Sequence, residues 1–572
     1  MNRILPIFIV LISFFGYSQK NYYVSQDNGN DVFNGSAPTT PFKTIDHAVD
    51  LLEPGDTLNI MGSYTNESYK AGYAYGGDKD DPYIWTQENT IRIAGLHGSE
   101  ENYITIRAYD DNTVIKGDGA NIFRMLNSSY IRIEGLNIAG EVNNIPLETA
   151  TALQFMYRED GSTNTLYRVQ PGTPPQEVEQ MTFEKLNNIS RPSYTDTRGM
   201  YLSNVDHIEI INNHIHHTPG NGLRVSDCEY ITISENEVND TSRKSYSGTH
   251  GLVVTKATST NASEEYKIFI TNNAVHHNYN EIYSWAPDKT IITPHIDEGK
   301  GISLQRNDVE RGWVHGRFLV ANNIVYLNGF SGVHSNDGDR MDFVNNTCYL
   351  NSYTNTVTYK NGEQRGNNIG MSSQRGDDIR FVNNIVVIDE SFGGYALAMA
   401  NTANGSVMNN LIYGLEGEPK QDSDVQDIQT GTMVANPLFR DVDAFDFTLM
   451  EDSPAIGSAN VEYAPAVDYF LEPRDDMPDL GAIEFNASLG LEGGVTANPA
   501  SIYPNPFNNR LYITSGTPLG DIRLYDFNGR LVKRVNVMDL ATAKETLLDL
   551  SDLSTGPYLL LVNGKIYKVI KQ

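Results

Sequence analysis

The repeat IEIINNHIHH (residues 208–217), ITISENEV (231–238) and IFITNNAVHHN (268–278) decides the fold. Each copy is a short strand of alternating apolar and polar residues, a residue pair that ends in Asn, and a second alternating strand. Four later copies continue the pattern: FLVANNIVYLN (318–328), DFVNNTCYLN (342–351), IRFVNNIVVI (379–388) and SVMNNLIYG (406–414). The second residue of each pair is Asn213, Asn236, Asn273, Asn323, Asn346, Asn384 and Asn410, at intervals of 23, 37, 50, 23, 38 and 26 residues.

This spacing predicts an all-β solenoid. Each strand alternates with period two and is too short to bury its own apolar face, so the copies must stack. The short intervals match one coil and the long ones match a coil plus a loop. An Asn at a fixed corner suits such a stack, since Asn tolerates a left-handed bend and its amide can bond to the Asn of the next coil. The equal blades and hairpin turns of a β-propeller do not occur. We therefore expect a right-handed parallel β-helix.

A second repeat assigns side chains to the two faces of each coil. NGLRVSD, HGLVVTK, KGISLQR, SGVHSND and IGMSSQR align on Gly222, Gly251, Gly301, Gly332 and Gly370. Because side chains alternate along a strand, the residues after the glycines should form one inward column: Leu223, Leu252, Ile302, Val333 and Met371. Two outward columns should follow, Arg224, Val253, Ser303, His334 and Ser372, and then Ser226, Thr255, Gln305, Asn336 and Gln374.

The two ends of the chain differ from the solenoid. Arg3 precedes an apolar run, which predicts a signal peptide over residues 1–19. That run of about 14 residues is shorter than the ~20 that span a bilayer, so we expect no transmembrane segment. Residues 487–500 have the composition of a linker, and residues 501–572 carry a positive net charge in a chain whose formal net charge is −30.

Both ends also resemble known families. YYVSQDNGNDVFNGSAPTTPFKTIDHAVDLLEPGDTLNI (residues 22–60) resembles the N-terminal cap of extracellular parallel β-helix carbohydrate-active enzymes, in which TPFKTIDHAVDLL is a helix and PGDTLNI the first strand. The run from Asn436, with NPLF, DFTL, SPAIG and DLGAIEF, resembles the last coils of the same proteins. YPNPFNNRLYI, IRLYDFNGRLV, LSTGPYLLLV and KVIKQ resemble the β-sandwich sorting domain of type IX secretion, over residues 501–572.

These resemblances imply a domain organisation and a location. We expect a catalytic β-helix over residues 20–486, interrupted by a polar insertion at about 141–198, and then a small β-sandwich. The protein would meet the type IX secretion machinery and end up secreted or attached to the cell surface.

Charge limits the partners. The formal net charge of −30 argues against a nucleic acid or an anionic membrane surface. The net charge does not exclude an anionic polysaccharide as a partner, because a cleft can be locally basic. The segment from Arg224 to Arg317 has 10 basic and 13 acidic side chains and is closer to neutral than the whole chain, with 42 and 72.

Titratable residues gather on the central coils, where ten of the twelve histidines lie between His207 and His334. The candidate catalytic residues are Lys300, His250 and His334. The candidate substrate-binding residues are Arg224, Arg306, Gln305, Asn336, Asp297 and Asp337. Elimination from a uronate needs a cation for the carboxylate, a base for the proton on the adjacent carbon and an acid for the departing oxygen. Arg224 or a bound cation, Lys300, and His250 or His334 would supply these groups.

Hydrolysis is the alternative chemistry on the same scaffold. It needs two carboxylates ~5–9.5 Å apart, and Asp297 or Glu298 opposite Asp337 or Asp339 would serve. The stretch from Asp297 to Gly301 also offers oxygen ligands for calcium. No run of aspartates matches the calcium site of pectate lyases, so metal dependence stays open.

We expect a secreted enzyme that degrades a polysaccharide. A lyase that acts by β-elimination on an acidic, uronate-containing polymer, such as an algal polysaccharide with or without sulfate, is favoured over a glycoside hydrolase. A glycan-binding solenoid without catalysis would present a shelf of exposed aromatic side chains, whereas the expected columns are polar and titratable. The sequence names neither the sugar nor the linkage.

Overall fold

The computed structural model describes residues 19–66, 69, 88–147, 150, 155–157, 165–168, 176–180, 193–245, 247–282, 298–352, 357–358, 364–365, 368–390 and 394–485, and, in the C-terminal unit, residues 501–505, 507–515, 519, 522–526, 531–535, 544–551, 553, 556–562 and 565–571. The predicted signal peptide lies almost wholly outside these residues. Among the helices of the described ranges, none has the length and hydrophobicity that a membrane crossing requires.

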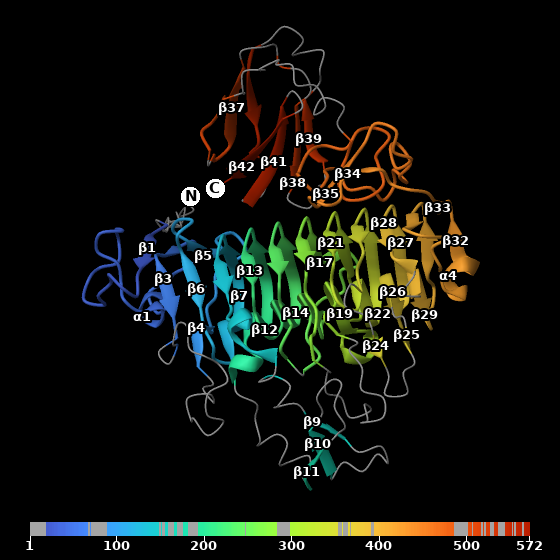
Figure 1. Ribbon diagram of the computed structural model, residues 1–572. Coiled ribbons are helices and arrows are strands. Elements are labelled where there is room, and N and C mark those ends of the chain that lie inside the picture. Colours follow the sequence, from blue (N-terminus) through green and yellow to red (C-terminus); the bar gives the residue numbers. More distant parts are fainter. Residues whose placement is uncertain are drawn as a thin grey trace, which may run out of the picture.

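A long parallel sheet runs along the whole solenoid (Figure 1). Its strands are β1 (Asn21–Val24), β2 (Thr57–Ile60), β4 (Asn89–Ala94), β5 (Ile104–Ala108), β7 (Asn121–Glu134), β12 (Arg198–Ile211), β14 (Leu223–Ser234), β16 (Leu252–Thr255), β17 (Tyr266–Thr271), β19 (Ile302–Asn307), β20 (Arg317–Ala321), β22 (Ser331–Val344), β26 (Asn368–Gln374), β27 (Asp377–Val382), β29 (Gly394–Ala400), β30 (Ser406–Met408) and β32 (Gln429–Thr430). A strand and its partner one coil later pair in parallel register, as in β12 and β14.

A second parallel sheet closes the coils. It consists of β3 (Ser63–Thr65), β6 (Val114–Lys116), β8 (Asn137–Ala139), β13 (His214–His216), β15 (Glu237–Asn239), β18 (Ala274–His276), β21 (Ile324–Tyr326), β23 (Thr347–Tyr349), β28 (Ile385–Ile388), β31 (Leu411–Gly414) and β33 (Met433–Val434). Apolar side chains from both sheets form one continuous core along the axis. The prediction of a parallel β-helix is confirmed.

Asparagine side chains form a ladder at the corner between the sheets. Each ladder amide donates to the Asn of the next coil: Asn213 to Asn236, Asn236 to Asn273, Asn273 to Asn323, Asn323 to Asn346, Asn346 to Asn384 and Asn384 to Asn410, at 2.9 to 3.0 Å. The repeat therefore predicted the stacking of the coils correctly.

The left-handed bend belongs to the neighbouring residue. The first member of each pair has positive φ, for example 54° at Asn212, 59° at Asn272 and 54° at Asn322. The expectation that one Asn performs both tasks is wrong. The bend needs a residue that tolerates positive φ, whereas the ladder needs a buried amide directed along the stack, and adjacent side chains point in different directions.

Removal of one ladder amide should destabilise the solenoid. The Asn323 amide donates to Asn346 Oδ1 and to the Ile270 carbonyl, and its oxygen accepts from the backbone and the side chain of Asn273. Asn323→Ala removes the acceptor of the buried Asn273 N–H together with three side-chain hydrogen bonds, and one unpaired buried group costs about 1–3 kcal/mol. We expect the free energy of unfolding in urea to fall by about 2–3 kcal/mol. Exposed Asn28 is the matched control, and an equal effect of Asn28→Ala would contradict the ladder's role.

Short elements cover the ends and sides of the solenoid. The expected N-terminal helix is only α1 (Ile45–Val49), whose N-cap Thr44 accepts from the His47 N–H. Among the described residues up to 485, the remaining elements are the antiparallel sheet of β9 (Phe155–Tyr157), β10 (Thr165–Arg168) and β11 (Gln176–Gln180), the pairs β24 (Val357–Thr358) with β25 (Gln364–Arg365) and β34 (Phe439–Asp441) with β35 (Asp446–Leu449), the helix α4 (Ser423–Ile428), and the 3-10 turns Val142–Asn144, Ser193–Thr195 and Val309–Arg311.

The C-terminal unit consists of two antiparallel sheets around a separate apolar core. One sheet contains β36 (Ser501–Tyr503), β37 (Arg510–Thr514) and β40 (Glu545–Asp549), and the other β39 (Leu531–Val535), β38 (Ile522–Asp526), β41 (Gly556–Val562) and β42 (Lys565–Lys571). This arrangement confirms the small β-sandwich. Leu559 and Leu561 of β41 pack against Val467, in the segment that follows the last coils.

Candidate active site

The glycine alignment predicted the register of the central coils. Leu223, Leu252, Ile302, Val333 and Met371 pair in sequence on β14, β16, β19, β22 and β26, and all are buried. The first outward column pairs in the same order, from Arg224 to Ser372.

The outward columns are more covered than expected. Ser303 is completely buried, and His334 is only 7% exposed. The Gln305 amide bonds to both Ser303 Oγ and His250 Nε2, at 2.9 Å each, and so lies over the column. The expectation of an open shelf along these strands is therefore wrong, because flanking polar side chains bond to one another above it.

A buried ionic cluster forms where β16 and β19 begin. Glu298 Oε2 lies 3.0 Å from Lys300 Nζ and 3.3 Å from His250 Nε2. The Lys300 ammonium also lies 4.6 Å from the centre of the Phe330 ring. His250 and Lys300 are 1% and 6% exposed, so neither is the outward surface residue that the alignment suggested. The structure nevertheless brings these two candidate catalytic residues together, through Glu298.

The ring nitrogens of His250 have different neighbours. The backbone N–H of Lys300 lies 3.3 Å from Nδ1. Nε2 lies 2.9 Å from the Gln305 amide nitrogen and 3.3 Å from Glu298 Oε2. Glu298 therefore contacts both His250 and Lys300.

His334 lies apart from this cluster. Its Nδ1 is 2.8 Å from Ser372 Oγ. Burial, together with the charges of Lys300 and Arg375, lowers the pKa of His334 well below its ordinary value. The imidazole is neutral at neutral pH. Its strand lies three coils beyond that of Arg224, which separates the two backbones by ~14 Å at ~4.8 Å per coil.

A pocket of about 190 Å³ adjoins the ionic cluster. It is lined by Asp196, Arg198, Tyr201, Asn221, Arg224, Ser245, Ser247, Gly248 and Thr249. Asn221 Oδ1 accepts from the backbone N–H of His250 at 2.9 Å. A Cβ on Gly248 would lie 2.9 Å from Glu298 Oε1, so that carboxylate sits directly behind the pocket wall. The pocket and the cluster are therefore neighbours, although Glu298, His250 and Lys300 do not line the pocket.

Three arginines surround a tyrosine in this pocket. The guanidinium carbons of Arg124, Arg198 and Arg224 lie 4.1, 5.5 and 5.8 Å from the centre of the Tyr201 ring. Burial and the charges of Arg198 and Arg306 act together to lower the pKa of Arg224. Within the described ranges, neither Arg198 nor Arg224 forms an ion pair with a carboxylate.

Sequence reasoning found Arg224 but missed its partners. Tyr201 pairs with Arg224 on one side and with Arg124 on the other. The signal was present, because RGMYLSN aligns on Gly199 one coil before the first glycine of the repeat. An extended alignment would have put Tyr201 at the head of the outward column.

A second, wider groove lies farther along the same strands. Its volume is about 530 Å³, and it is lined by Asp227, Lys256, Thr258, Arg306, Arg311, Asn336, Asp337 and Arg375. Asp337 pairs with Arg375 at 2.6 Å, and Asn336 bonds to the same guanidinium. In the described part of the chain, the exposed side chains of Lys256 and Arg306 have no carboxylate partner. This groove brings together three predicted substrate-binding residues, Arg306, Asn336 and Asp337.

The carboxylates of the hydrolytic alternative are engaged elsewhere. Asp297 lies outside the described residues. Glu298 and Asp337 belong to separate ion pairs. Asp339 accepts from the Val309 N–H, and burial raises its pKa. No group of three or more His, Cys, Asp or Glu side chains positioned to hold a metal ion occurs among the described residues.

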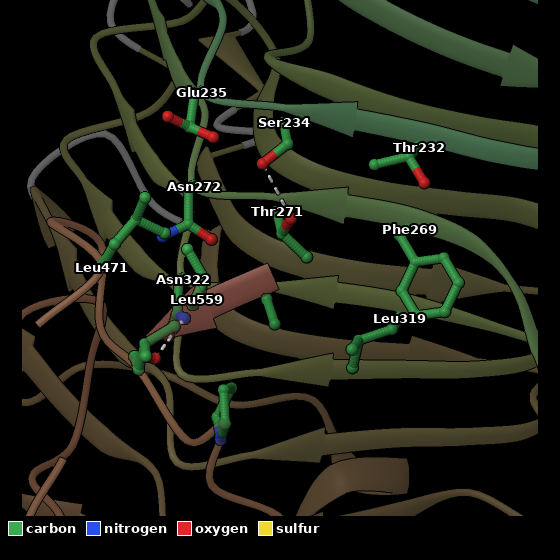
Figure 2. A pocket seen from close by; sticks show the side chains of 13 residues that line it. Thr232, Ser234, Glu235, Phe269, Thr271, Asn272, Leu319, Asn322, Leu471 and Leu559 are labelled. Atoms are coloured by element: carbon green, nitrogen blue, oxygen red, sulfur yellow. Dashed lines mark hydrogen bonds between the residues drawn. The ribbon is translucent and has the colours of Figure 1, made fainter. Parts of the chain in front are cut away.

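A third concavity differs in chemistry. It lies between β14, β17, β20, the segment around Val467 and β41 of the C-terminal unit (Figure 2). Phe269, Leu319, Leu471 and Leu559 form much of its lining, and Glu235 is its titratable residue. Such a lining offers no convergent acid and base.

Five histidines cluster on the second sheet, at His214, His216, His217, His276 and His277. His216 Nδ1 and His217 Nδ1 are 2.7 Å apart, and the same atoms of the other adjacent pair are 2.8 Å apart. Burial, then the charges of His214 and His217, lower the pKa of His216 to about 4.

This cluster predicts acid lability. The pKa of His216 is about 6.5 in the unfolded chain and about 4 when folded, so the unfolded chain binds the proton first as the pH falls through this window. The free energy of unfolding should therefore decrease between about pH 6.5 and pH 4. His216→Gln should reduce this slope in urea titrations at several pH values. Identical slopes in the variant and the parent would refute the assignment.

Comparisons with known proteins agree with this architecture. Residues 198–347 match the family model of the right-handed β-helix region, and residues 501–572 match that of the secretion system C-terminal sorting domain. The chain thus combines a β-helix with a type IX secretion sorting domain, and it is a secreted or cell-surface protein.

Several solved structures are similar in outline. The pectate lyase Pel9A has 15% identity and a TM-score of 0.40, over 82% of this chain and 98% of that chain. A rhamnogalacturonan lyase has 12% identity and a TM-score of 0.39, over 82% of this chain and 96% of that chain. The A-module of the Azotobacter vinelandii mannuronan C-5 epimerase AlgE4 has 11% identity and a TM-score of 0.33, over 66% of this chain and 86% of that chain. No curated protein matches the chain.

Proposed function

We propose that this protein is a secreted polysaccharide lyase that cleaves an acidic, uronate-containing polymer by β-elimination. The observation that carries the proposal is the pair Arg198 and Arg224, which line one pocket without a carboxylate partner among the described residues. Cations that lack a partner in a concave site are suited to an anionic ligand, and guanidinium groups bind carboxylates in a bidentate manner.

The carboxylate clamp would also assist the reaction. Removal of the proton next to a carboxylate places negative charge on the carboxylate oxygens. Arg198 and Arg224 would stabilise that charge, and their fixed positions against Tyr201 avoid reorganisation during the reaction.

Lys300 is better placed to donate a proton than to accept one. The sequence suggested it as the base, but its ammonium is paired with Glu298 at 3.0 Å. We assign Lys300, supported by Glu298 and His250, the task of protonating the departing glycosidic oxygen.

The second groove extends the site for a polymer. Lys256 and Arg306 lie on adjacent coils, ~4.8 Å apart along the solenoid, and the Lys256 N–H donates to the Gln305 carbonyl. Arg306 is close enough to Arg224 to affect its pKa. An acidic chain could therefore contact both grooves at once.

The test is a product analysis. The secreted protein is incubated with polyuronates, sulfated polysaccharides and neutral glycans, and both reducing ends and the ultraviolet absorbance of unsaturated uronates are recorded. New reducing ends together with absorbance are expected from uronate-containing polymers. Reducing ends without absorbance would identify a glycoside hydrolase, and binding without either product would identify a glycan-binding solenoid.

A further inference from the structure

The ionic cluster of Glu298, Lys300 and His250 has been assigned the proton donor. The base that removes the proton next to the uronate carboxylate still has to be identified. We propose that Tyr201 is this base and that it acts as a phenolate between the guanidiniums of Arg198 and Arg224. This inference rests on the proposed β-elimination, and it assigns a catalytic role to a residue outside the aligned repeats.

The position of Tyr201 satisfies the geometric requirement. It lines the same pocket as Arg198 and Arg224, so a uronate held by the two guanidiniums lies against the tyrosine. Its hydroxyl is 3.3 Å from Ser226 Oγ. The Ser226 hydroxyl donates its one proton to Asp227 at 2.9 Å, so it donates to the phenolate only when it turns away from Asp227.

The charges around Tyr201 favour its ionised form. Burial raises the pKa of Tyr201, but the Ser226 hydrogen bond and the charges of Arg224, Arg124 and Arg198 outweigh burial and lower it overall. A phenolate at neutral pH needs such surroundings, because an ordinary tyrosine has a pKa of about 10.

The charged groups that face Tyr201 come from three strands and one loop. Arg124 lies on β7, Arg198 on β12 and Arg224 on β14, while Asp196 precedes β12 and also lines the pocket. The remaining lining side chains are uncharged: Asn221, Ser245, Ser247 and Thr249. Three cations thus oppose one carboxylate.

The proposed step balances without a further reactant. The phenolate oxygen of Tyr201 takes the proton from the carbon next to the uronate carboxylate, and the electron pair of that C–H bond forms the new C=C bond. The bond from the neighbouring carbon to the glycosidic oxygen breaks, and the oxygen leaves with its electron pair. Lys300 supplies the proton to that oxygen. Tyr201 then returns its proton to solvent and Lys300 regains one.

Tyr201→Phe is the first test, because phenylalanine keeps the ring that packs against Arg124. We expect kcat on the best uronate polymer to fall by at least about 10³-fold, within the range of general base catalysis. KM and the urea midpoint should change little. Tyr230→Phe is the matched control. This tyrosine lies on β14 and its hydroxyl accepts from Asn261, away from the pocket, so normal turnover is expected.

Two further measurements separate a catalytic from a structural role. In the wild type, kcat/KM should rise with pH until Tyr201 is ionised, and Ser226→Ala should move this limb to higher pH because it removes a hydrogen bond that lowers the pKa of Tyr201. An ultraviolet difference titration of the wild type against Tyr201→Phe should show one tyrosinate that forms below the ordinary pH range. That titration needs no substrate.

The outcomes distinguish this inference from the proposed function. Unsaturated uronates from the wild type together with near wild-type kcat in Tyr201→Phe would overturn the tyrosine base and leave β-elimination standing. Absence of unsaturated products from any uronate polymer would overturn both. A difference titration without an early tyrosinate would also count against the phenolate.

Discussion

Lys300→Met should lower kcat on an acidic polysaccharide by about 10²–10⁴-fold, the usual contribution of a general acid. The variant removes the ammonium beside Glu298 but keeps an apolar side chain against Phe330. His250 Nε2 would remain as the basic neighbour of Glu298, at 3.3 Å. The measurement is the initial rate of unsaturated product formation at saturating substrate.

Stability must be followed in the same experiment. Because Lys300 is only 6% exposed and sits in an ion pair, its removal should also lower the thermal unfolding temperature, unlike the loss of a surface lysine. Lys43→Met, on the exposed surface of the N-terminal cap, is the control and should leave both rate and stability unchanged. A folded Lys300→Met protein with normal turnover would remove Lys300 from the mechanism.

Lys267→Met should be the most destabilising of these substitutions. Lys267 and Glu229 form an ion pair at 2.7 Å with side chains 0% and 2% exposed. Glu229 also accepts from the backbone N–H and the hydroxyl of Thr260. Without Lys267, its carboxylate would remain buried without a cation, which costs about 3–5 kcal/mol. Urea unfolding monitored by circular dichroism measures this loss.

A double variant tests the reason for that loss. Lys267→Met combined with Glu229→Gln removes both charges, and the new amide oxygen can still accept from Thr260. The double variant should recover most of the stability, because the penalty belongs to the unpaired charge rather than to the lost attraction. If both variants are equally destabilised, packing rather than charge is responsible.

The repeat in the sequence was sufficient to predict how the coils stack. A ladder Asn such as Asn273 is identified by local pattern, since the pair always falls between two alternating strands. The glycines aligned the coils well enough to place Leu252 and Ile302 in one buried column. In a solenoid each coil contacts only its neighbours, so a register read locally holds for the whole stack.

The direction of the flanking side chains was not predictable in this way. His250 and Lys300 precede their glycines and were expected at an open entrance, yet both are buried. Both pair with Glu298, which precedes β19 and lies outside the aligned repeats. The spacing between repeats differs from coil to coil. The repeat pattern therefore does not predict the position of a carboxylate that lies between two repeats.

The sequence by itself determined the solenoid, the register of its columns, the basic side chain at Arg224 and the sorting domain at the C-terminus. Only the tertiary structure decided that Arg224 shares a pocket with Tyr201 and Arg198 and that this pocket backs onto Glu298. The physical reason is the range of the interactions. Alternation and the Asn ladder connect neighbouring coils with one fixed geometry, whereas the site depends on electrostatic and packing contacts between loops and coils of different lengths.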